Sequence, residues 1–391
     1  MKRVLLATTA LCVGAGMAAA EVALSGNAEM GVVGSKDDSE RFHTDVNVKF
    51  SLSGETQGGV TFGTEIELSD IEDADGRKTT NADDEHGGIA VHISDPDGFG
   101  TLTMGDTDGA YDWALSEIVG VGGGSINDAQ EHGAYDGNGG LDGTFDGQIL
   151  RWDRAIASGF SLGASVELDD DTDGEPDGAE SDTFNPVLGV GVKYEMGMGL
   201  GKLGLGGGFQ TTSYDGKVED VNDVLLAGAE VDAAIFGGSV SMDFTNGGDG
   251  LKVIANASMM DADGSATVND ITGTVDIEQT YLGVGLGYHI GDIELGLNAA
   301  SKVTEGTADA NSARPNDSAT VEETVTGVGF AATYDLGGGA SLQFGVGSSE
   351  TEVDYTYGSA LSQYAGNSTG EDSHDSSSDT NKWSLGVAFS F

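Results

Sequence analysis

Polar and apolar residues alternate with a period of two along several stretches of this chain. In residues 41–53 most second positions from Phe42 to Leu52 are apolar, and the positions between them are charged or polar. Residues 60–69 and 160–168 repeat the pattern. A period of two places successive side chains on opposite faces of a β-strand. These stretches match the length of a tilted strand crossing a bilayer, whereas strands of soluble sandwiches are nearer to about five or six residues.

The charged members of these stretches are unsuited to a packed core, but they fit a water-filled lumen. The apolar face of each strand would then contact lipid. The inward face carries seven charged or titratable side chains, which form the predicted pore wall: Arg41, His43, Asp45, Lys49, Glu65, Glu67 and Glu167.

The C-terminal residues 383–391 alternate in the same way. Apolar side chains from Trp383 to Phe391 share one face, and small or polar side chains occupy the other. In a closed membrane barrel the last strand pairs with the first, and a terminal aromatic residue lies in the interfacial girdle. We therefore expect Phe391 at the closure of a barrel, with a soluble sandwich as the alternative.

The connections between the apolar stretches alternate in length. Short turns, such as 53–59 and 290–293, are followed by long acidic connections, which is typical of outer-membrane barrels. If Val231–Phe244 forms a single strand, the pattern predicts an all-β, 16-stranded antiparallel transmembrane β-barrel. The long connections are 70–87, 107–147, 169–186, 261–278, 306–323 and 356–381.

The first twenty residues have the pattern of an export signal. Lys2 and Arg3 precede a short apolar run, and Ala18 to Ala20 supply a small-residue cleavage site. We predict a signal peptide over residues 1–20 and one barrel domain over 21–391. The single cysteine, Cys12, lies inside the predicted signal peptide, so no disulfide is expected.

The chain is strongly acidic, with 16 Lys and Arg against 66 Asp and Glu and a formal net charge of −50. A surface of this charge repels nucleic acid and is therefore not expected to bind it. The carboxylates are concentrated between the apolar stretches, as in residues 169–177. The acidity therefore indicates charged loops rather than a disordered chain.

Three segments in order resemble the general diffusion porins of Gram-negative bacteria, in particular their alphaproteobacterial branch. They are Gly100–Ala110 (GTLTMGDTDGA), Ile149–Asp153 (ILRWD) and Gly159–Ala164 (GFSLGA). The resemblance implies a homotrimer in the outer membrane, surrounded by lipid and lipopolysaccharide, that passes small hydrophilic solutes and ions. It also implies that the long third loop, 107–147, folds into the pore. An apolar wall around the first strand could supply the trimer contact.

The third loop and the strand after it contain the predicted pore constriction. The loop and its entry are acidic, and Arg151 lies on the inward face of the following strand. Opposed carboxylates and a guanidinium across a narrow lumen select solutes by size and charge. Alternatively, Arg151 holds the loop in place by pairing with a wall carboxylate. The predicted constriction residues are Asp106, Asp108, Asp112, Glu117, Arg151 and Asp153.

An acidic stretch beyond residue 168 matches the ligand spacing of a calcium loop. Asp169, Asp171, Asp173 and Glu180 occupy positions one, three, five and twelve of that pattern. Pro176 stands where such loops usually carry an apolar residue. We therefore favour the interpretation that these residues are nonspecific surface charge on an external loop over the interpretation that they bind calcium. No cofactor is required.

The sequence predicts a channel rather than an enzyme, because it contains no nucleophile elbow and no dinucleotide-binding fingerprint. The excess of carboxylates predicts a preference for cations. Two other functions stay open: a structural or adhesive barrel with a closed pore, and a substrate-specific channel.

Overall fold

The computed structural model describes most of the chain. The described ranges are 21–36, 38–68, 88–118, 120–135, 139–142, 148–168, 183–219, 225–245, 247–268, 271–310, 318–357 and 372–391. The predicted signal peptide, residues 1–20, lies outside them. None of the helices in these ranges is long and apolar enough to span a membrane.

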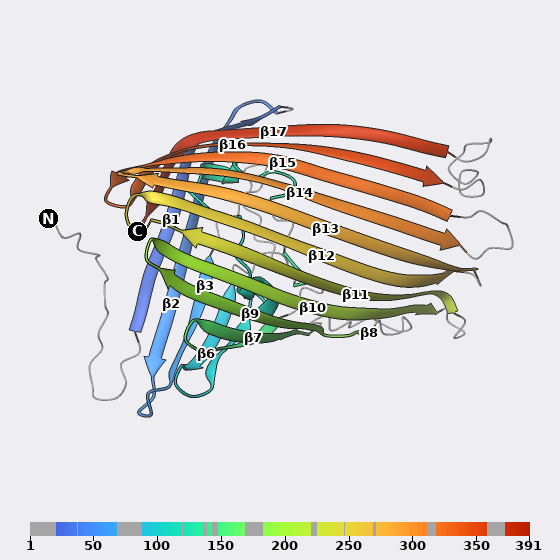
Figure 1. Ribbon diagram of the computed structural model, residues 1–391, viewed down its shortest axis with the longest axis horizontal. Coiled ribbons are helices and arrows are strands. Elements are labelled where there is room, and N and C mark those ends of the chain that lie inside the picture. Colours follow the sequence, from blue (N-terminus) through green and yellow to red (C-terminus); the bar gives the residue numbers. More distant parts are fainter. Residues whose placement is uncertain are drawn as a thin grey trace.

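Antiparallel strands form one sheet that closes on itself (Figure 1). Each strand pairs with its neighbours in chain order, and β17 pairs with β1. The strands are β1 (Glu21–Ser35), β2 (Arg41–Glu55), β3 (Thr61–Leu68), β4 (Ile89–Asp95), β5 (Gly100–Gly105), β6 (Ile149–Ala157), β7 (Phe160–Glu167), β8 (Thr183–Phe184), β9 (Val187–Met198), β10 (Gly201–Glu219), β11 (Leu225–Asp243), β12 (Gly250–Val268), β13 (Ile271–Ile290), β14 (Ile293–Ala310), β15 (Ser318–Gly337), β16 (Ala340–Tyr357) and β17 (Asp372–Ser390).

The seventeen segments form sixteen strands of the barrel, because β8 and β9 pair with the same edge of β10 and together make one strand. Asn185 and Pro186 separate them, and the Asn185 N–H donates to the Ser213 carbonyl at 2.9 Å. A proline cannot donate to the ladder, so the strand is interrupted at a bulge. Pro186 therefore lies within this interrupted barrel strand rather than in a turn. The expected loop over 169–186 was too long, because the strand already begins at Thr183. The predicted sixteen-strand barrel is confirmed, and β11 is one strand that begins before Val231.

The outer face of the barrel is apolar over a band of several residues in each strand. On β13, for example, Leu282, Val284 and Leu286 are 40–61% exposed, and the residues between them are glycines. At the closure the Phe391 N–H donates to the Gly26 carbonyl at 2.9 Å, and the Phe391 ring is 77% exposed.

The strands differ greatly in length (Figure 1). Strands β10–β17, the tall wall, have 18 to 20 residues, whereas β3–β7, the short wall, have six to nine. The tall strands continue into the expected acidic connections 261–278, 306–323 and 356–381. In the first of these, β12 and β13 cover every residue except 269 and 270. Beyond the apolar band both faces meet water, so the alternation disappears while the backbone ladder continues. The alternation in the sequence therefore stops several residues before the strands themselves end.

Between β5 and β6 the chain leaves the sheet and enters the barrel, where Figure 1 draws it in teal. This segment contains one helical turn, α1 (Ala110–Ala114), and a 3-10 turn, η1 (Ile126–Asp128). We call residues 109–142 the inner loop.

Candidate functional site

The inner loop runs along the inside of the tall wall and returns. Tyr111 contacts β10 and β11, Val121 lies on β13, and Ile126 reaches β17 and β1. On the way back His132 contacts β15, and Leu141 bonds to β10. These contacts are all with wall residues on the face opposite to the lipid-facing one, so the loop lies inside the barrel.

At the far end of this path the loop turns against β1. Asn127 and Asp128 have φ angles of 51° and 44°, a left-handed conformation that Asn and Asp tolerate better than most residues. The Glu29 carboxylate on β1 accepts the Asn127 N–H at 2.9 Å and lies 3.3 Å from the His43 Nε2 atom. Glu29 therefore anchors the turn of the loop to the wall.

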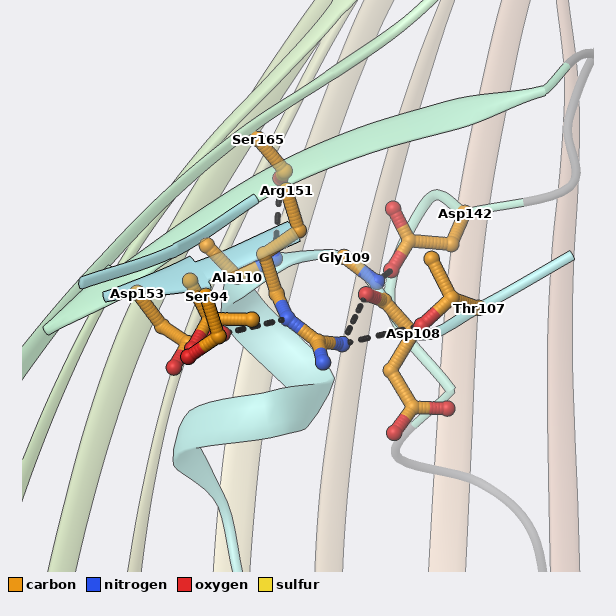
Figure 2. A network of polar contacts seen from close by, with 10 residues as sticks. Ser94, Thr107, Asp108, Gly109, Ala110, Asp142, Arg151, Asp153 and Ser165 are labelled. Carbon is orange, nitrogen blue, oxygen red and sulfur yellow. Dashed lines mark hydrogen bonds and ion pairs between the residues drawn. The ribbon is translucent and has the colours of Figure 1, made fainter. Parts of the chain in front are cut away.

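At the root of the loop Arg151 binds the loop backbone (Figure 2). Its Nη1 atom donates to the Asp108 carbonyl at 2.5 Å and to the Thr107 hydroxyl at 3.2 Å. Its Nε atom is 3.4 Å from the Asp153 carboxylate on the same strand. The Arg151 side chain is only 12% exposed. This geometry favours the interpretation that Arg151 holds the loop in place over the one that it faces a carboxylate across open water.

A second cation, Lys193 on β9, lies near the loop root. Its Nζ atom is 4.4 Å from the ring centroid of Trp113 in α1, a cation–π arrangement. Asp142, also at the loop root, accepts the Gly109 N–H at 2.8 Å and a hydrogen bond from the Gln210 amide. Burial raises the pKa of the Asp142 carboxyl, and these two hydrogen bonds oppose the rise.

Buried aromatic and imidazole groups fill the space between loop and wall. Tyr111 is fully buried with Leu115, Leu141 and other apolar side chains around it, and burial raises the pKa of its hydroxyl. Burial lowers the pKa of the His132 imidazole to about 4, and the neighbouring Asn298 side chain partly opposes the shift. The loop therefore has a packed core of its own.

The predicted constriction residues divide into two groups. Asp108, Arg151 and Asp153 lie together at the loop root (Figure 2), where Asp106 and Asp108 are exposed. Asp112 and Glu117 are half-buried along the loop. That these residues form the constriction stays a prediction.

The predicted wall residues also divide. Lys49 on β2 and Glu65 on β3 form an ion pair of 2.6 Å on the inner face of the barrel, beside Glu67. Two others do not face water and are corrected here. Glu167 on β7 is 1% exposed, and His43 is 6% exposed beside Glu29. Arg41 is exposed at the start of β2, and Asp45 accepts a bond from Asn47 at 2.9 Å.

The candidate calcium ligands Asp169, Asp171, Asp173 and Glu180 lie outside the described residues. Within the described part of the chain, no group of three or more His, Cys, Asp or Glu could hold a metal ion.

Three elements of the site were missed in the sequence: Glu29, Lys193 and the glycines beneath the loop. Glu29 and Lys193 have the inward parity, and that signal could have found them. The glycines recur at every second residue, as in Gly283, Gly285 and Gly287, which shows that one strand face was reserved for a close neighbour.

Comparison with known protein families and solved structures agrees with the barrel fold. The family model described as Gram-negative porin matches residues 7–354. A porin structure refined at 1.8 Å resolution is 22% identical with a TM-score of 0.56, covering 95% of this chain and 100% of that one. OmpT, an outer membrane protein of Vibrio cholerae in its in-vitro folded trimer form, is 13% identical with a TM-score of 0.53, covering 95% and 99%. No curated protein sequence matches significantly.

A closed antiparallel barrel with an apolar outer band and an internal loop defines an outer-membrane channel protein. The chain belongs to the Gram-negative porin family and resides in the outer membrane. Its place in the alphaproteobacterial branch stays a prediction.

Proposed function

We propose that this porin is a general diffusion channel for small hydrophilic solutes and ions and that it carries out no catalysis. The observation that supports this most directly is the position of the inner loop. It follows the inner face from β7 and β9 along the tall wall to β1, so the space for solutes lies between the loop and the inner face of β2 to β5. That face carries ion-paired and polar side chains, such as Lys49 and Glu65, rather than an aromatic track.

We propose in addition that the channel prefers cations. Asp106, Asp108 and Asp128 are exposed on the loop, while Arg151 and Lys49 are each within ion-pair distance of a carboxylate. Fixed negative charge raises the local concentration of cations and lowers that of anions. Salt weakens the effect, because the screening length falls from about 10 Å at 0.1 M to about 3 Å at 1 M.

Planar-bilayer recordings test both proposals. We expect stepwise conductance, and a reversal potential of cation-selective sign under a KCl gradient at low ionic strength. Asp108→Asn should lower the cation-to-anion permeability ratio by about twofold, since the carboxylate is exposed at the loop root. The matched control Glu305→Gln removes one charge from the outer face of β14 and should leave the ratio unchanged.

Each contrary result has a distinct meaning. Folded protein without conductance steps would support a structural or adhesive barrel with a closed pore. Anion selectivity at low salt would overturn the charge proposal alone. Saturation by one sugar or amino acid would support a substrate-specific channel.

We also propose a homotrimer that buries the short wall. β4 and β5 have seven and six residues. At about 3.3 Å per residue a tilted strand of this length rises less than the apolar band of about 25 Å. A protein neighbour would shield this side better than lipid. The adjoining β1 and β2 expose Leu24, Met30 and Phe42, the last by 90%. The OmpT structure, described as a trimer form, supports the same assembly.

Two further points of the function stay predictions. Lipopolysaccharide is the expected neighbour of the outer face, and calcium bound at residues 169–180 is a weaker expectation. Equilibrium dialysis with ⁴⁵Ca²⁺ on the wild type and on Asp171→Asn would test the second.

A further inference from the structure

Glycines line much of the inner face of the barrel where the inner loop passes. On several strands they occupy alternate residues, which keeps them on one face. The glycines nearest to the loop are Gly163 on β7, Gly191 on β9, Gly206 and Gly208 on β10, Gly237 on β11, Gly285 and Gly287 on β13, Gly296 on β14, Gly327 and Gly329 on β15, Gly345 and Gly347 on β16, Gly386 on β17 and Gly31 on β1.

Loop carbonyl groups rest directly on several of these glycines. A Cβ atom added to Gly287 would overlap the Val121 carbonyl oxygen, and one added to Gly329 would overlap that of Gln130. Gly191, Gly206, Gly296 and Gly347 lie in the same way beneath the carbonyls of Ala110, Ala114, Gly122 and Glu131. Only glycine lets two backbones approach this closely.

Several loop N–H groups donate hydrogen bonds to wall side chains. The Ala110 N–H donates to the Ser165 hydroxyl at 2.8 Å, and the Ser116 N–H to the Ser239 hydroxyl at 2.7 Å. These bonds matter because an irregular buried segment has no ladder partner, and each orphaned N–H costs about 1–3 kcal/mol.

One wall side chain holds both polar groups of a loop residue. The Thr333 hydroxyl on β15 accepts the Gly124 N–H at 3.0 Å and lies 3.0 Å from the Gly124 carbonyl oxygen. The Gln210 amide similarly accepts the Leu141 N–H at 2.7 Å and donates to Asp142.

We propose that the inner wall from β7 to β17 and β1 is a docking track for the loop backbone, and that its glycines and hydroxyls fix pore width. Glycine beneath each carbonyl sets how close the loop lies to the wall. Hydroxyl and amide side chains set its position along the wall. These are positioning residues, and the loop side chains that face the lumen set charge selectivity separately.

The inference rests on the proposed function in one respect, since pore width is measured as conductance. Gly287→Ala and Gly329→Ala place a methyl group under a loop carbonyl, which must retreat by about 1.5 Å to restore van der Waals contact. The matched controls are Gly207→Ala and Gly238→Ala. These glycines lie on the outer face, where an added Cβ would meet its nearest neighbours at 3.7 and 3.6 Å.

We expect the two track variants to conduct about 1.5-fold less than the wild type and to exclude smaller solutes in liposome swelling. The cation-to-anion permeability ratio should stay within error, and both controls should match the wild type. Wild-type conductance in folded track variants would overturn the inference.

Hydrogen–deuterium exchange tests the same inference without conductance. We expect slow exchange for Ala110, Ser116 and Gly124 in the wild type, because wall side chains bind their N–H groups. Thr333→Val should speed exchange at Gly124 at least tenfold, and Thr333→Ser should restore protection. Exchange in the wild type as fast as in an unfolded peptide would overturn the inference even if a track variant fails to fold. A protected loop in a barrel that does not conduct would instead contradict the proposed diffusion function.

Discussion

The tall and short walls of this barrel use the same two-residue alternation for different purposes. On the short side the inner face carries charges such as Lys49, Glu65 and Glu67. On the tall side the inner positions beneath the loop are mainly uncharged, with glycines such as Gly287 beside apolar side chains such as Ile254 and Val325. Charge therefore dominates where the wall meets water, and glycine and apolar residues dominate where the tall wall meets the loop. The comparison shows that the inner face of one sheet can serve as solvent-facing wall on one side and as packing surface on the other.

The outer faces differ too. The short wall is apolar along most of its length, whereas the tall wall continues beyond the apolar band into rows of carboxylates. One row crosses six neighbouring strands at directly opposed positions: Asp261, Glu278, Glu305, Glu322, Asp354 and Asp375. Like charges placed opposite each other destabilise a sheet, so such a row persists only where water and salt screen it.

The largest effect is expected from the packing of the loop on the tall wall. Tyr111→Ala empties a fully buried site and should cost about 3–5 kcal/mol of loop docking. We expect noisy channels with flickering conductance and rapid hydrogen exchange throughout residues 109–135. Phe236→Ala changes a 50%-exposed ring on the outer face of β11 and serves as the control. Quiet channels with a protected loop would mean that Tyr111 does not hold it.

The next prediction compares a lipid-facing residue of the tall wall with a residue of the proposed trimer contact. Leu297→Lys on β14 puts a charge against lipid and should cost about 2–4 kcal/mol of barrel stability near the bilayer centre, without changing the oligomer. Leu24→Lys on β1 should instead release monomers if β1 and the short wall form the trimer contact. Crosslinking and native electrophoresis of unheated samples in detergent measure both. A Leu24→Lys protein that keeps the wild-type oligomer would place the contact elsewhere.

The loop should loosen in acid because of His132. Its folded pKa of about 4 lies below the ordinary value of about 6.5, so folding favours the neutral ring. Docking stability is then constant above about pH 6.5, falls between about pH 6.5 and 4 by at most about 3 kcal/mol, and changes little below that. The groups that face the ring are Tyr135, Asn298 and, at longer range, Lys382, whose charge also disfavours protonation.

Hydrogen exchange at residues 129–135, corrected for its intrinsic pH dependence, should report this loosening. His132→Gln should abolish the change between pH 6.5 and 4. If the variant keeps the wild-type pH profile, another group controls the loop.

The smallest effect concerns the carboxylate row on the tall wall. Glu305→Gln removes the repulsion with Glu278 and Glu322 and should raise the thermal unfolding midpoint by about 1 °C at low ionic strength. The difference should vanish at about 1 M salt, where the screening length is about 3 Å. A salt-independent difference would show that charge repulsion is not its cause.

Several features were predictable from the sequence because they depend on local alternation. The strands starting near Arg41, Thr61 and Phe160 agree with the predicted stretches to within two residues. The inward parity of Arg151 was also correct. Alternation records which face meets lipid, and the bilayer imposes that pattern on every spanning strand regardless of its partners.

Other features depended on contacts between distant residues. The tall strands extend beyond the lipid, where water on both faces erases the pattern while cross-strand hydrogen bonds persist. Arg151 has the inward parity predicted for it, but only the folded loop brings the Asp108 carbonyl to its guanidinium. Glu167 has the same parity as Glu65, yet Glu167 is 1% exposed whereas the Glu65 side chain is 48% exposed.

The sequence by itself determined the barrel, its closure at Phe391, and which face of each strand looks inward, because these follow from a two-residue period and from the lipid around it. Only the tertiary structure decided which inward residues meet water and which meet the loop. That choice depends on the path of the inner loop across strands about 260 residues away in the chain, such as Gly386 from Ile126. Alternate glycines mark a strand face that has a close neighbour, but they do not say which segment fills it, because the wall binds much of the loop through backbone carbonyl and N–H groups that every residue shares.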